Sequence, residues 1–105
     1  MLAREMVEPT RALDELVESA YRPMTELLRQ IVRELGGGRL SQTEVRLCVR
    51  SILGQCLYYR HARPVIVRLN PDETFEPADV ERLAAHVTRF SLEAITALAN
   101  KGERA

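Results

Sequence analysis

Apolar residues recur at helical spacing along most of this chain. In the first long stretch they are separated by steps of three and one residues, which predicts an amphipathic helix over residues 10–35. Pro23 lies inside this helix, where it removes a hydrogen bond and clashes with the carbonyl oxygen of Ser19, so we expect a kink there. Three consecutive glycines, 36–38, then end the helix.

A second helix is predicted over residues 42–62. Ser41 and Glu44 form the S-x-x-E pattern of a capping box, in which each side chain binds a backbone amide that the first helical turn leaves unpaired. Pro64 marks the end of this helix, because the residue before a proline is pushed out of the helical conformation.

A third long helix is predicted over residues 77–99, with Pro77 at its first position. We expect a short helical turn at 65–69 before it and a frayed tail at 100–105 after it. The predicted fold class is therefore all-α, an antiparallel bundle of three long helices plus a short turn.

The three helices differ in how much of their circumference is apolar. Helix 10–35 has one apolar face, which predicts an outer helix, whereas helices 42–62 and 77–99 each have two. The main arcs, expected to form the core, are Val45, Cys48, Val49, Ile52, Leu53, Cys56 and Tyr59 on helix 42–62, and Val80, Leu83, Ala84, Val87, Phe90, Ser91, Ala94, Ile95 and Leu98 on helix 77–99.

The second apolar arcs of helices 42–62 and 77–99 consist largely of small or aromatic side chains. We expect no partner for them within one chain. A symmetric homodimer that pairs both helices with their copies, as a four-helix bundle, would bury them. The predicted interface residues are Leu47, Ser51, Gly54, Tyr58, Ala85, Leu92 and Thr96. The alternative is that an N-terminal segment of the same protein, absent from this sequence, covers one of these faces.

Composition narrows the function. The 105 residues suffice for one domain, residues 1–105, and 15 basic residues against 15 acidic ones give zero formal charge. A general nucleic-acid-binding protein needs a basic surplus, so this class is disfavoured. No apolar run approaches the roughly 18 residues of a membrane span and no secretory signal is visible, so we expect a cytoplasmic location without membrane contact.

The sequence contains no recognisable catalytic set. His61 and His86 lie on solvated arcs without a second ligand at helical spacing, so we expect surface histidines and no metal site. Cys48 and Cys56 are about 12 Å apart along one helix, too far for a disulfide. We expect both to be inert core thiols, the alternative being a redox sensor. We therefore predict no enzyme and no cofactor.

Two groups of residues are candidates for ligand binding. Tyr21, Met24, Leu28, Leu53 and Leu57 are chosen as the lining of a pocket for a small apolar or aromatic effector, the alternative being that such residues are ordinary core. The basic cluster Arg60, His61 and Arg63 can hold an anionic ligand, or can simply complement the negative end of a helix dipole.

An ordered set of features resembles the C-terminal domain of a subgroup of tetracycline-repressor (TetR) family regulators. The set comprises Glu8-Pro9, Arg22-Pro23, Gly54-Gln55, Tyr59-Arg60, Arg63-Pro64 and Phe90-Ser91-Leu92, and the resemblance covers roughly residues 3–96. No single motif is diagnostic, and the order of the whole set carries the resemblance.

The resemblance implies an all-helical effector-binding and dimerisation domain of a transcriptional regulator, in which an effector shifts two DNA-reading heads. The helix-turn-helix head expected upstream is missing from this chain, so we expect no direct nucleic-acid binding by the chain alone. The first pocket-forming helices of the family are also largely absent, which leaves any cavity open. The alternative function is a ligand-free helical interaction protein that pairs with another chain through its apolar faces.

Overall fold

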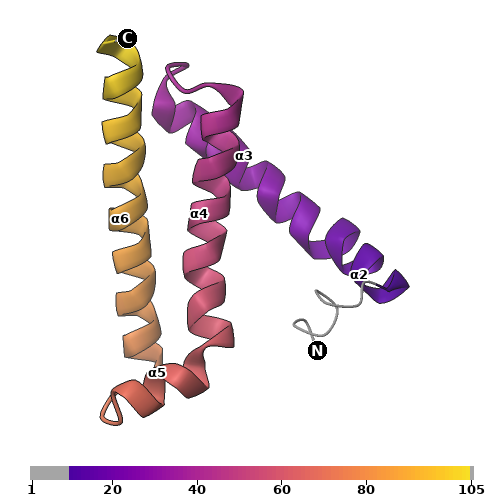
Figure 1. The fold of residues 1–105 in the computed structure, drawn as a ribbon, viewed down its shortest axis with the longest axis vertical. Helices are drawn as coiled ribbons and strands as arrows, with labels where there is room; N and C mark the ends of the chain where they lie inside the picture. The colour runs from indigo at the N-terminus through magenta and orange to yellow at the C-terminus, as the bar shows by residue number, and fades with distance from the viewer. Residues whose placement is uncertain (1–9, 105) are drawn as a thin grey trace.

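The computed structural model describes residues 10–104, and every regular element in that range is helical (Figure 1). In chain order these are α2 (Arg11–Leu16), the π-helical turn η1 (Val17–Tyr21), α3 (Arg22–Gly36), α4 (Gln42–His61), α5 (Arg63–Leu69) and α6 (Pro77–Arg104). The predicted all-α fold class is confirmed.

The first helix is continuous from α2 to α3, but it changes its hydrogen bonding before Pro23. Thr10 caps its start by accepting a hydrogen bond from the amide of Ala12. In η1 the helix widens, and the amide of Arg22 donates to the carbonyl of Val17, five residues back. A π turn of this kind disturbs the regular ladder at the point where the proline cannot donate. The sequence located this irregularity without predicting its form.

The turn between α3 and α4 follows its local signals. Gly37 and Gly38 adopt positive φ angles of 59° and 78°, which residues with a side chain rarely adopt. The predicted capping box is present: the amide of Glu44 donates to Ser41 Oγ and the amide of Ser41 donates to Glu44 Oε1, both at 3.1 Å.

The last two helices are longer than predicted. The expected turn at 65–69 is a seven-residue helix, α5, which begins before Pro64 because proline is well tolerated in a first helical turn. The expected fraying of 100–105 is wrong up to Arg104, where α6 ends. No proline interrupts this stretch of sequence.

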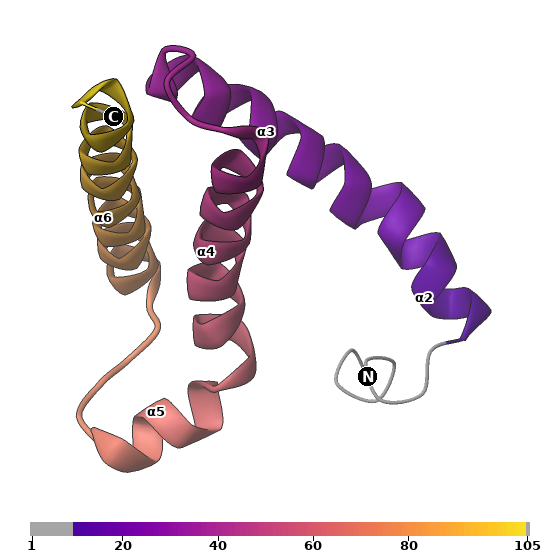
Figure 2. The same cartoon turned by 45° about the horizontal axis from the view of Figure 1, so that its top comes forward.

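Figures 1 and 2 show α4 and α6 side by side and antiparallel, with α3 crossing the pair obliquely. Helices α3, α4 and α6 all contact one another, whereas α5 contacts α4. Within the described residues, α2 and η1 pack on the neighbouring parts of their own helix and on no other element.

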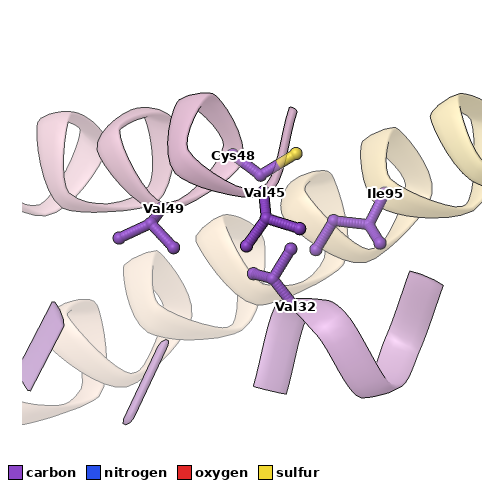
Figure 3. Close-up of a cluster of buried hydrophobic side chains, with 5 residues drawn as sticks. All are labelled: Val32, Val45, Cys48, Val49 and Ile95. Atoms are coloured by element: carbon purple, nitrogen blue, oxygen red, sulfur yellow. The ribbon is translucent and has the colours of Figure 1, made fainter. Parts of the chain in front are cut away.

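The core lies where these three helices meet (Figure 3). Val32 of α3 is completely buried and faces Val45 of α4 and Ile95 of α6, with Cys48 and Val49 completing the cluster. Leu28, Leu40, Ile52 and Leu53 pack around it. The remaining apolar surface is not covered to the same degree.

Several residues expected in the core are exposed. Phe90 and Val80 of α6 are both more than half exposed, so their assignment to the core arc is wrong. On α3, Met24, Leu27, Ile31 and Leu35, which belong to the apolar face of the predicted outer helix, are also exposed. The apolar faces of α3 and α6 are wider than the surface that one neighbouring helix can cover, so part of each stays exposed. The radius of gyration is 16.2 Å, compared with about 13 Å for a compact domain of this length.

Candidate functional site: an apolar groove between three helices

A partly open groove of about 850 Å³ runs between α3, α4 and α6, beside the core. Its volume lies in the range of natural small-molecule sites, which is about 300–1,000 Å³. The lining is dominated by aliphatic side chains. It consists of Leu28, Ile31, Val32, Leu35, Ile52, Cys56, Leu57, Tyr59, Arg60, Phe75, Val80, Leu83, Ala84, Val87, Thr88, Ser91, Leu92 and Ile95.

Helix α6 forms the longest wall of the groove. Its lining residues recur at steps of three and one from Val80 to Ile95, so they share one face over about 22 Å of helix. Because α4 runs antiparallel to α6, the start of α6 lies near the end of α4 (Figure 1). The groove therefore has two different ends, one at the core beside Ile95 and one near Arg60 and Phe75.

The core end contains a polar link between α4 and α6. Gln55 Nε2 donates to Ser91 Oγ at 3.2 Å and also lies 3.4 Å from the carbonyl oxygen of Ser51. Ser91 is buried and lines the groove, and its own hydroxyl hydrogen is not committed by this bond. The Thr88 hydroxyl, in contrast, donates to the carbonyl oxygen of Ala84.

The other end is basic and aromatic. Arg60, in the last turn of α4, lines the groove. The guanidinium of Arg63, the first residue of α5, lies 4.3 Å from the centroid of the Phe75 ring, a cation–π distance. This contact joins the segment between α5 and α6 to the start of α5, directly after the end of α4. The sequence offered Arg60 and Arg63 as a basic cluster, and the structure brings both to this end of the groove.

Only some of the predicted pocket residues line the groove. Leu28 and Leu57 line the groove, whereas Leu53 packs against the core and Tyr21 and Met24 lie farther back on the first helix, outside the groove lining.

The predicted interface residues all lie on exposed positions of α4 and α6. Leu47 is 53% exposed, Tyr58 51% and Leu92 41%. Ser51, Gly54, Ala85 and Thr96 are also exposed. Leu92 has a second environment, because it also borders the groove.

The two cysteines differ. Cys48 belongs to the core, and burial raises the pKa of its thiol. Cys56 is exposed and lines the groove, so its assignment to the core is wrong. His61 and His86 are exposed, as predicted. Across residues 10–104, no three His, Cys, Asp or Glu side chains gather as a metal site.

Sequence reasoning missed Phe75 and most of the α6 wall as binding residues. Phe75 lies in an irregular segment, where helical periodicity carries no information, although an aromatic residue between Pro71 and Pro77 was a visible signal. Most of the α6 lining residues were expected in the core, whereas Leu92 was assigned to the homodimer interface. They line the groove because no described element fills the space opposite them.

No helix within residues 10–104 has the length and apolar run needed to cross a bilayer. A family model of the C-terminal domain of the HTH-type transcriptional dual regulator CecR matches residues 1–95. Searches of curated proteins and of solved structures found no match. The family match covers nearly the whole chain, including every element that forms the core and the groove up to Ile95. The chain therefore belongs to the family of the C-terminal domain of the HTH-type transcriptional dual regulator CecR.

Proposed function

We propose that this chain is the effector-binding and dimerisation domain of a transcriptional regulator of the tetracycline-repressor type. The observation that carries the proposal is the apolar groove of about 850 Å³, framed by three helices of a regulator's C-terminal domain. A small apolar or aromatic effector is the kind of molecule that such a lining binds.

Dimerisation is supported by the amount of surface that the single chain leaves exposed. Within the described residues, twelve large apolar side chains are more than a third exposed, and apolar surface of this extent usually marks a partner site. The second faces of α4 and α6, which hold Leu47, Tyr58 and Leu92, are the surfaces that we assign to this homodimer.

An effector bound in the groove can change the angle between α3 and the α4–α6 pair. The walls of the groove belong to α3 on one side and to α4 and α6 on the other, so a bound molecule favours one angle between them. Helix α3 continues through η1 into α2, which projects away from the α4–α6 pair (Figure 2). A ligand that prefers one of two α3 positions would therefore move α2, and binding at the groove would be coupled to the N-terminal side of the domain.

The experiment is a thermal-shift panel of small apolar and aromatic compounds on the purified chain. A true effector raises the melting temperature as its concentration increases. At 100-fold its Kd, it adds about 2.7 kcal/mol to the free energy of unfolding. Ala84→Trp fills the groove and should abolish the shift, whereas Ala97→Trp, at an exposed α6 position outside the groove, should preserve it. Equal shifts in both variants would refute binding in the groove.

The second candidate is a ligand-free interaction protein that offers its apolar helix faces to a different chain. The observation in its favour is the number of large apolar residues left exposed, among them Met24, Leu27 and Phe90. This function predicts no thermal shift with any compound and a monomeric mass for the isolated chain, which separates it from the proposal above.

A further inference from the structure

The charged lining of the groove is positive. Among the residues that the structure describes, Arg60 is the one Asp, Glu, Lys or Arg that lines it. The ion pairs resolved within residues 10–101 join Arg22 to Glu18, Arg29 to Glu26 and Arg82 to Asp79, and none involves Arg60. Its guanidinium therefore lies beside an apolar groove, and no carboxylate of the described side chains forms an ion pair with it.

The residues around Arg60 add positive charge to this end of the groove. From Arg60 to Leu69 the sequence contains three arginines and no acidic residue. The side chain of Arg63 lies over the Phe75 ring, and Arg68 donates to the carbonyl oxygen of Pro64. The segment that follows places Phe75 in the lining, but none of its acidic residues, Asp72, Glu73, Glu76 and Asp79, lines the groove. Asp79 is already bound by Thr74, by the amide of Glu76 and by Arg82.

The positive charge stands at one end of a long apolar wall. Arg60 is in the last turn of α4, near the start of α6, and the aliphatic face of α6 continues from Val80 to Ile95, about 22 Å away. A molecule lying along this wall can place an anionic group on the guanidinium while its apolar body covers the α6 face. Arginine is suited to this task because its planar fork donates two parallel hydrogen bonds to a carboxylate, sulfonate or phosphate.

We propose that the effector is a small organic anion with an elongated apolar body, whose acidic group binds Arg60 and whose body lies along the α6 face of the groove. This inference rests on the proposed function and adds the ligand class to it. It differs from a purely apolar or aromatic effector in one respect: loss of the ligand's charge costs affinity, and the loss depends on Arg60.

A second role for Arg60 has to be separated from this one. A positive charge in the last turn of a helix also stabilises that helix by interacting favourably with the negative end of its dipole. That role changes the stability of the domain, but it does not discriminate between charged and neutral ligands. Ligand selectivity, rather than melting temperature, is therefore the measurement that distinguishes them.

Two fluorescent probes share one ring system and differ in charge: 1-anilinonaphthalene-8-sulfonate and the neutral N-phenyl-1-naphthylamine. We would titrate both into the wild-type chain, Arg60→Gln, Arg60→Lys and the control Arg50→Gln, an exposed arginine of α4 outside the groove. We expect Arg60→Gln to weaken binding of the sulfonate about tenfold and that of the neutral probe less than twofold. Arg60→Lys should restore part of the loss, and Arg50→Gln should change neither affinity.

Three outcomes would overturn the proposal. If Arg60→Gln leaves the sulfonate affinity unchanged, or weakens both probes equally, the groove can still bind ligands but the anionic class is wrong. If Ala84→Trp does not weaken either probe, both bind elsewhere and the groove assignment fails as well. If neither probe binds the wild-type chain, the proposed effector-binding function fails together with this inference.

Discussion

Gln55 of α4 donates a hydrogen bond to Ser91 of α6, with 3.2 Å between Nε2 and Oγ, and this bond joins the two antiparallel helices at the wall of the groove. Ser91 is buried and Gln55 is half-buried, so the bond is partly shielded from water. It gives the α4–α6 pair a polar register point among otherwise apolar contacts, and a shift of one helix along the other would leave Ser91 without this partner.

Removing this bond should destabilise the domain. Ser91→Ala is expected to lower the free energy of unfolding by about 1 kcal/mol, since a typical internal hydrogen bond is lost. Urea unfolding followed by circular dichroism measures it. The control is Thr43→Ala, which removes an exposed hydroxyl of α4 outside the groove and the proposed interface. In a double-mutant cycle with Gln55→Ala, the coupling energy should be clearly different from zero, and additive effects would show that the bond contributes nothing.

Val32 tests whether the three-helix core is where the structure places it. It is fully buried between α3, α4 and α6, so Val32→Ala removes two methyl groups from a packed site and should cost about 2 kcal/mol. Val65→Ala is the matched control because Val65 is 53% exposed, and its effect should stay within about 0.5 kcal/mol. Equal costs for the two variants would contradict the core assignment.

The capping box at the start of α4 should contribute measurable stability. Ser41→Ala leaves the amide of Glu44 without its acceptor and is expected to cost about 1 kcal/mol. Thr43→Ala, at an exposed position two residues later, keeps both capping bonds and should cost much less. Chemical unfolding of the two variants in parallel provides the comparison, and a Thr43→Ala cost as large as that of Ser41→Ala would count against the cap.

Asp79 makes stability depend on pH in the acid range. Hydrogen bonds from the Thr74 hydroxyl and the Glu76 amide, with a smaller contribution from Arg82, hold the pKa of this carboxyl below its ordinary value. Because the folded-state pKa is depressed, the contribution is fully present above the unfolded value of about 3.9 and is lost as pH falls through the folded value.

The test is the free energy of unfolding between pH 7 and pH 2. Asp79→Asn should remove part of the acid destabilisation seen in the wild-type chain, while Asp72→Asn, at an exposed position in the preceding segment, should leave the profile almost unchanged. Identical profiles for the wild type and Asp79→Asn would show that these hydrogen bonds do not act on folding.

The helices were predictable because their signals are local. The steps of three and one, the Ser41–Glu44 capping box and the glycines after α3 each depend on a few neighbouring residues. The π turn before Pro23 was located but not described, since the sequence shows that a hydrogen bond must be lost and not how the helix rearranges.

The candidate site was less predictable because it depends on how helices are oriented. Leu28 and Leu57 were identified, but a helical wheel does not show which arc faces a neighbour and which faces an open groove. For the same reason Cys56 was assigned to the core although it lines that groove. Phe75 was not predicted as a site residue because it belongs to no helix. Its contact with the Arg63 guanidinium joins two segments that helical periodicity does not relate.

Gly54 gives the sharpest variant for the proposed homodimer. A Cβ atom added at this position meets nothing within 4 Å in the single chain, so a larger side chain fits the monomer. Helix propensity alone should make Gly54→Ala more stable, by up to about 1 kcal/mol. Gly54→Leu therefore should leave the fold intact and block close approach of a second copy. Ala97→Leu, outside both the groove and the proposed interface, is the control.

The most direct test of the account is the mass of the purified chain in solution, measured by sedimentation equilibrium over a range of concentrations. We predict twice the chain mass of 11.9 kDa for the wild type and for Ala97→Leu, and a shift toward 11.9 kDa for Gly54→Leu. A wild-type chain that remains at 11.9 kDa at about 100 μM, a concentration at which an interface with micromolar Kd would be nearly saturated, would contradict it.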